Sequence, residues 1–206
     1  MSCGWKRIAL AAIGMGAAWA GEASAQAVGK VDKVEAEVTA TSKAGTRRLE
    51  PATNILYEDV LVSGPKARLQ ATLQDGTQLT LGENGRLVVD RFVYDPAKAG
   101  GGLDLRVTRG AFLFVGGKVE EKSGGAVSIR TPVATLGVRG TTVWGGRIDG
   151  GYGVLVLSGE VDVRTARGTV KLRKGQGTLI RGTPSSPAPW SADRTRRAVA
   201  TIAFTP

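Results

Sequence analysis

The sequence predicts an all-β domain of many short strands, arranged as a β-solenoid-like stack or as a twisted sandwich. Three observations predict this class. Apolar and polar residues alternate with a period of two rather than with the period of a helix. The 30 glycines of the 206-residue chain are dispersed and separate these alternating runs. Turn glycines also recur at short intervals between residues 64 and 177, as they do in all-β domains.

The N-terminal residues 1–25 do not share this alternation and have the organisation of a secretory signal peptide. Lys6 and Arg7 precede an apolar run over residues 8–20, which is shorter than the roughly 20 residues of a membrane span. Small residues follow the run, in the spacing that a signal peptidase cleaves, and the pattern ends at Ala25. We therefore expect cleavage near Ala25, a periplasmic or otherwise exported protein, and no transmembrane span in the mature chain.

Two alternatives to this cleavage stay open, a cut after Ala20 and an uncleaved signal anchor. Cleavage after Ala20 or after Ala25 removes Cys3, the only cysteine of the chain. The mature domain would then have no disulfide, so burial of apolar side chains and backbone pairing have to stabilise it.

The predicted strands follow one another along residues 26–182, which we expect to form a single β domain. Asp75-Gly76 is a hairpin-type turn between strands at residues 68–73 and 77–81. In the same way Ser158-Gly159 is predicted to be a turn between two strands, and a loop is expected over 95–102. The further strands are predicted, in chain order, at residues 86–89, 103–107, 110–115, 153–157, 160–164, 170–173 and 178–180.

The C-terminal residues 183–206 are predicted to be a Pro/Ser-rich linker followed by a basic tail. Proline does not continue the interior of a sheet, so residues 183–191 are expected to be extended. Residues 193–204 fit a short amphipathic helix or a final strand, but we expect a weakly ordered tail because chain ends fray unless they are tied down. Trp190 is the expected anchor of this tail, and Trp144 is expected in the core.

Positive charge is concentrated in the C-terminal part of the chain. The formal net charge is +10, and residues 131–206 contribute an excess of seven, from 11 basic and 4 acidic side chains. Such an excess favours anionic partners through long-range attraction. Because the chain is expected to be exported, we expect an anionic envelope polymer or a lipid surface rather than nucleic acid; a merely solvated surface is the alternative.

The composition argues against an enzyme. The chain has no histidine, and its cysteine lies in the predicted signal peptide, so the usual nucleophile–base pairs and most zinc or copper sites are excluded. The adjacent acids Glu58-Asp59 and Glu120-Glu121 would point to opposite faces of a strand, so we expect them to be solvated. The spaced acids of a calcium loop are also missing. We expect no cofactor and no metal; the enzymatic alternative is a carboxylate-based hydrolase of an envelope polymer.

Residues 128–144, SIRTPVATLGVRGTTVW, form the most unusual stretch of the sequence. A strand turns at Thr131-Pro132, and Gly137 and Gly140 then occur among β-branched residues, where glycine indicates a bend or a close backbone approach. Arg139 lies between these glycines, and its guanidinium can bind backbone carbonyls or a carboxylate. We expect Arg139 to clamp a corner between strands; an anion or partner contact is the alternative.

A second group of basic residues follows in the predicted C-terminal strands. A hairpin over residues 161–173, turning at Arg167-Gly168, would place three of its basic side chains on one face. A solvated face is the alternative to a binding surface. The candidate contacts for an anionic partner are Arg164, Lys171, Arg173 and Lys174.

Several of these motifs resemble those of the FecR domain family. Residues 75–84 (DGTQLTLGEN) and 92–96 (FVYDP) resemble its first half, and residues 109–112 (RGAF) and 131–142 (TPVATLGVRGTT) its central signature. Residues 156–161 (VLSGEV) resemble a closing strand, and the resemblance covers about residues 28–181. We expect the signature residues to be structural; they are Asp75, Gly76, Thr131, Pro132, Gly137, Arg139, Gly140 and Thr141.

The resemblance implies a non-enzymatic, all-β periplasmic module, known from regulators of iron-siderophore uptake signalling. Those regulators have a cytoplasmic region that controls a sigma factor, and this sequence shows no such region before its apolar segment. We therefore expect an exported binding or scaffold module for an envelope protein or polymer. The alternative is an accessory regulator of cell-surface signalling, of the iron-uptake type, that works with a separate membrane-spanning partner.

Overall fold

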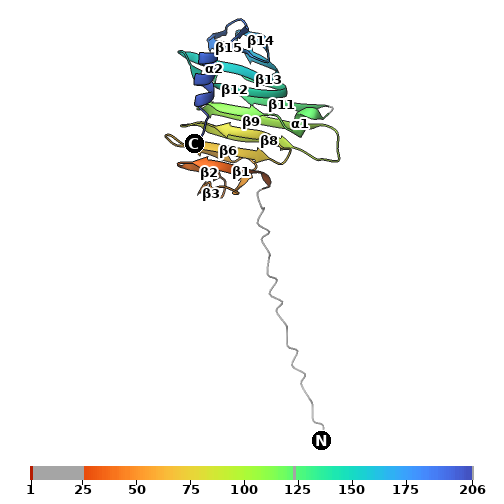
Figure 1. Ribbon diagram of the computed structural model, residues 1–206. Helices are drawn as coiled ribbons and strands as arrows, with labels where there is room; N and C mark the ends of the chain where they lie inside the picture. Colours follow the sequence, from red (N-terminus) through yellow and green to blue (C-terminus); the bar gives the residue numbers. More distant parts are fainter. Residues whose placement is uncertain (2–25, 123, 206) are drawn as a thin grey trace.

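A computed structural model describes residues 1, 26–122 and 124–205. Apart from Met1, the predicted signal peptide lies outside these residues. The described chain is mostly strand, and its strands stack one above another from β1 and β2 near one end to β14 and β15 at the other (Figure 1). The all-β prediction is therefore confirmed.

The strands form one curled sheet with two layers. The first layer has the order β4-β1-β6-β7-β10-β12-β13-β15 and the second β3-β2-β5-β8-β9-β11-β12-β13-β14. Strands of the first layer are β1 (Ala27–Glu35), β4 (Asn54–Leu56), β6 (Arg68–Leu73), β7 (Gln78–Leu81), β10 (Phe112–Val115) and β15 (Gln176–Arg181). Strands of the second are β2 (Val38–Ser42), β3 (Gly45–Arg48), β5 (Val60–Ser63), β8 (Arg86–Val93), β9 (Gly101–Arg109), β11 (Gly125–Arg130) and β14 (Gly168–Arg173).

Two long strands, β12 (Thr135–Ile148) and β13 (Gly151–Thr165), belong to both layers. The first part of β12 pairs with β11 and its second part with β10, so the β12–β13 hairpin passes from one layer to the other. Apolar side chains of both layers pack into one core, which includes Leu69, Leu105 and Phe112. Burial of this core, without a disulfide among the described residues, holds the layers together.

The bend of the long hairpin corrects one sequence prediction. Ser158-Gly159 is not a turn between two strands, because β13 continues through it. Gly159 has φ +77° and Gly140 on β12 has φ +60°, and the register of the pair shifts beside them. A Cβ on Gly159 would collide with the Gly140 carbonyl, so two glycines let the strands bend together in close contact.

The other hairpins agree with the sequence. β6 pairs antiparallel with β7 across Asp75-Gly76, and β13 pairs with β14 across a turn at Ala166-Arg167, one residue before the predicted Arg167-Gly168. The loop expected over residues 95–102 is shorter, since β9 already begins at Gly101.

The C-terminal segment differs from the weakly ordered tail that the sequence predicts. After β16 (Thr183–Pro184) and β17 (Ala188–Pro189), residues Ala192–Ala200 form helix α2, which stands along one side of the strand stack (Figure 1). Ser191 caps the helix by accepting a hydrogen bond from the Arg194 amide at 3.2 Å.

Helix α2 packs against the strands through a second apolar cluster. Ala198 and Ile202 are buried there with Trp144 and Leu155 of β12 and β13, and Trp190 packs edge-on against Trp144 with ring centroids 5.9 Å apart. The Trp144 indole also donates a hydrogen bond to the Thr201 hydroxyl at 3.1 Å. The expected anchoring by Trp190 is therefore seen, and burial of this cluster orders the segment.

Candidate functional site

Asp75, the first residue of the motif at residues 75–84, connects two separate segments of the chain inside the fold. This side chain is 1% exposed and accepts hydrogen bonds from the Thr77 amide at 3.0 Å and the Thr77 hydroxyl at 2.8 Å. It also accepts from the Val119 amide at 3.2 Å, at the short helix α1 (Lys118–Glu121). Gly76, with φ +86°, completes the turn. Asp75 therefore joins the β6–β7 turn to α1.

Helix α1 in turn holds the bend of β12. The Glu120 carboxylate accepts a hydrogen bond from the Thr141 amide at 3.0 Å. The Thr141 hydroxyl, itself buried, accepts from the Arg139 amide at 3.0 Å and lies within hydrogen-bonding distance of the Arg139 and Glu160 carbonyls. Burial raises the pKa of Glu120, against the hydrogen bond from Thr141. The side chains of Asp75 and Thr141 are thus buried and make hydrogen bonds within the fold.

Sequence reasoning missed the acids that perform these structural tasks. Asp59 and Glu120 were both expected to be solvated, but Asp59 is fully buried, where it pairs with Arg47 and accepts from the Leu56 amide at 2.7 Å. Their neighbours Glu58 and Glu121 are exposed. Neither pair lies in a strand as expected, since Glu58-Asp59 precedes β5 and Glu120-Glu121 lies in α1, and one acid of each pair points inward to bind a backbone amide.

The turn at Thr131-Pro132 is closed by its own threonine. The Thr131 hydroxyl accepts from the Ala134 amide at 3.0 Å and contacts the Ala134 carbonyl at 2.9 Å, while Pro132 is exposed. This hydroxyl bonding is the local chemistry that favours threonine at a turn.

Arg139 does not form the expected clamp. Its side chain is exposed and makes no hydrogen bond or ion pair with the described residues, and the corner is held by Thr141 instead. Gly137 does not bend the strand either: a Cβ there would meet only the Asp162 side chain, at 3.9 Å. Gly137 therefore leaves open space above β12.

This space is part of a shallow groove of about 460 Å³ on the outer face of the second layer, which we call the hairpin groove. The groove collects three of the basic side chains singled out from the sequence, Arg139, Arg164 and Lys171. Its lining also includes Ser128, Gly137, Glu160 and Asp162. Lys174 is exposed at the β14–β15 turn and is not part of the groove.

Glu160 and Asp162 neutralise much of the positive charge of the basic residues that were predicted to share one face. Lys171 Nζ lies 3.3 Å from Asp162 and 3.5 Å from Glu160, and Arg173 Nε lies 3.2 Å from Glu160. Arg164 is 3.8 Å from Asp162. Hydrogen bonds from Arg173 and Lys171 lower the pKa of Glu160, so it is ionised at neutral pH. The groove has both charges, with Arg139 as its unpaired cation among the described residues.

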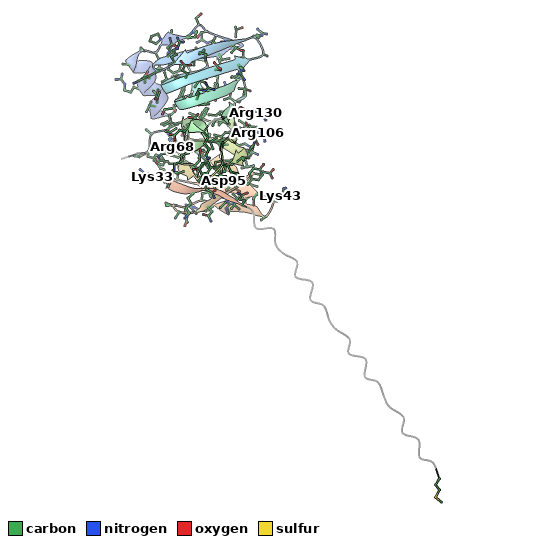
Figure 2. All side chains as sticks on the ribbon, turned by 90° about the vertical axis from the view of Figure 1, so that its right-hand side faces the viewer. Lys33, Lys43, Arg68, Asp95, Arg106 and Arg130 are labelled. Carbon is green, nitrogen blue, oxygen red and sulfur yellow. The ribbon has the colours of Figure 1, made fainter. Side chains whose placement is uncertain are left out.

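The charged face continues beyond the groove. Arg106 on β9 and Arg130 on β11 occupy paired positions and lie close together (Figure 2). Arg106 forms an ion pair with Asp90, so this part of the face also contains both signs of charge.

Metal sites and membrane-spanning helices are both absent from the described part of the chain. No group of three or more His, Cys, Asp or Glu side chains is placed to hold a metal ion there. Neither of the described helices has the length and apolar character needed to cross a membrane.

Comparisons with known proteins agree with this architecture. The family described as FecR protein matches residues 59–162, and no curated protein matches the chain. Two crystal structures of a "putative anti-sigma factor" from Parabacteroides distasonis ATCC 8503 are similar in fold, with TM-scores of 0.55 and 0.51 and identities of 18% and 17%. In each comparison the match covers 66% of this chain and 62% of the other. The match over residues 59–162, half of the chain, shows that this chain belongs to the FecR family.

Proposed function

We propose that this protein is a non-enzymatic, exported protein-binding module that regulates cell-surface signalling together with a separate membrane-spanning partner. Membership of the FecR family supports a regulatory role rather than an enzymatic one. The observation that carries the proposed binding activity is the hairpin groove, where basic and acidic side chains line one exposed hollow.

The charges of the hairpin groove favour a protein partner over an anionic polymer. Glu160 and Asp162 pair with Lys171 in the groove and would repel a uniformly negative chain. A protein surface offers both signs of charge, so it can replace the intramolecular pairs while binding the unpaired Arg139. These exposed pairs are weak, and exchanging them for intermolecular pairs costs little.

Export is a separate part of the proposal and is tested separately. Mass spectrometry of the protein isolated from the periplasm of the native host should give an N-terminus at Gln26. Full-length protein confined to the cytoplasm would overturn the proposed location.

The binding test uses photo-crosslinking in the native host, with the crosslinking residue at Ser128 in the hairpin groove. The matched control position is Lys43, which is 97% exposed and lies on the β2–β3 turn. We expect Ser128 to capture a membrane-spanning protein and Lys43 not to capture it. The double variant Arg139→Glu/Lys171→Glu should reduce this capture and change the transcription of genes that respond to iron limitation, as deletion of the protein does.

Equal capture from both positions would refute the groove as the binding surface. An unchanged transcript profile in the deletion strain would refute the signalling role even if a partner is captured.

A further inference from the structure

A second hollow lies between the two ends of β12, where the bent hairpin brings distant turns together. It has a volume of about 470 Å³ and is lined on one side by Pro132 and Val133 and on the other by Gly150 and Gly151. Tyr152 also lines it, so we call it the tyrosine pocket. It shares no lining residue with the hairpin groove, and its size suits a small molecule or a chain terminus.

The tyrosine pocket has two positive charges and no acid in its lining. Arg109 and Arg147 line it, and the guanidinium group of neither makes an ion pair or a hydrogen bond with the described residues. Asp149, two residues from Arg147, is engaged by Arg194 at 2.8 Å and Arg197 at 2.7 Å. The arginines of the pocket are thus uncompensated, unlike the basic residues of the hairpin groove.

The pocket also contains a buried hydroxyl group without a hydrogen-bond partner. Tyr152 is 8% exposed, and its hydroxyl makes no hydrogen bond of good geometry with the described residues, because the neighbouring Thr131 hydroxyl is already bonded to Ala134. Burial raises the pKa of Tyr152, against the weak polar contact with the Thr131 side chain and the positive charge of Arg147, so the hydroxyl keeps its proton at neutral pH. A buried donor without a partner is uncommon in proteins and favours a ligand that accepts its hydrogen bond.

We propose that the tyrosine pocket binds an organic carboxylate with a small apolar body. The carboxylate accepts a hydrogen bond from Tyr152 and pairs with Arg109 and Arg147, whose planar guanidinium groups match a carboxylate. The apolar body packs against Val133, which is 41% exposed, and Pro132. Such a ligand is either a free organic acid or the C-terminal carboxylate of a polypeptide.

The test is an NMR titration of the folded protein with 3-methylbutanoate, followed through the Gly150 and Gly151 amides at the pocket. The matched neutral probe is 3-methylbutanamide, which has the same shape without the charge. We expect saturable shifts with the carboxylate, weaker binding at higher salt, and little binding of the amide. Equal binding of the amide, or tighter binding of inorganic phosphate, would overturn the proposal.

Substitutions of the lining residues test which side chains contact the carboxylate. Arg147→Gln and Tyr152→Phe should each weaken binding about tenfold, since each removes one hydrogen bond to a charged group. Tyr152→Phe should fold as well as the wild type, because the missing hydroxyl has no partner in the folded protein. The control Arg48→Gln removes an exposed charge outside the pocket and should leave binding unchanged. Wild-type affinity in both pocket variants would refute the site.

A final arm distinguishes the two sources of the carboxylate. An apolar tripeptide with a free carboxyl end is compared with its amidated form and with 3-methylbutanoate. Tighter binding of the free tripeptide would assign a polypeptide C-terminus, and weaker binding would assign a small organic acid. Failure of all carboxylates would overturn this inference and leave the hairpin groove unaffected, because the two sites share no residue.

Discussion

Replacing Asp75 by alanine should destabilise the fold strongly, because this carboxylate serves several buried donors at once. Asp75→Ala would leave the amides of Thr77 and Val119 without their side-chain partner, and both residues are fully buried. Each buried amide that loses its partner costs about 1–3 kcal/mol, so for the two amides we expect a loss of about 2–6 kcal/mol. Domains of this size are stable by about 5–15 kcal/mol, so the variant should fold but unfold at clearly lower denaturant concentration.

The assay is equilibrium unfolding in urea, followed by the fluorescence of the buried Trp144. Asp95→Ala is the matched control, since Asp95 also accepts from the amide two residues on, at 2.9 Å, but on the surface. The control should change stability by no more than about 0.5 kcal/mol. Asp75→Asn keeps one acceptor oxygen and should fall between the two. Similar midpoints for Asp75→Ala and Asp95→Ala would refute the bridging role of Asp75.

Three further outcomes are expected from the same unfolding assay. The pKa of Glu120 is higher in the folded protein than in the unfolded chain, so ionisation of this side chain disfavours the folded state. The free energy of unfolding should therefore decrease as the pH rises above the ordinary carboxyl range. Glu120→Gln should therefore gain stability relative to the wild type between pH 4 and pH 7 (roughly the range over which carboxyl groups titrate); a pH-independent difference would contradict this. Gly159→Ala should cost about 2–4 kcal/mol through its positive φ and the collision with β12, whereas Gly175→Ala, with φ +80° and open space, should cost only about 1 kcal/mol. Ala198→Asp should undock α2 and cost about 2–4 kcal/mol, while the exposed Ala200→Asp should be nearly neutral; similar effects would show that the helix is not packed.

The parts of the fold that could be predicted from sequence are those that local chemistry decides. Asp75-Gly76 and Arg167-Gly168 lie at turns in which two adjacent strands meet, and the pairing follows directly. Ser158-Gly159 looks the same locally, but there the glycine bends a strand that continues. What distinguishes the cases is Gly140 on the partner strand, a contact that the local pattern does not contain.

The order of the C-terminal segment was not predicted, for a related reason, although a short amphipathic helix was one of the alternatives. Its own sequence is short and polar, so it has little tendency to be ordered alone. The side chains that stabilise it, Trp144 and Leu155, lie at least 35 residues earlier in the chain, and only the fold brings them to Ala198. Order in this segment comes from tertiary burial.

The candidate site was predicted in part. Arg164 and Lys171 were expected on one face, and the structure brings them together with Arg139. The same two-residue period places Glu160 and Asp162 on the face of Arg164, so the acidic partners had a usable signal in the sequence. Arg147 and Tyr152 are cross-strand neighbours in the β12–β13 hairpin, but nothing local links them to Arg109 of β9, which only the fold brings to the tyrosine pocket.

The signature residues and the two proposed binding surfaces are therefore connected through the bend. Asp75 holds α1, Glu120 of α1 holds the Thr141 amide, and Thr141 fixes the corner at which β12 changes layers. The hairpin groove lies on one arm of this hairpin, and the tyrosine pocket lies between its ends. The buried signature residues Asp75 and Thr141 fix the geometry of both proposed surfaces, whereas Arg139 and Pro132 of the same signature line them. The exposed side chains around the two hollows then determine which partner is bound.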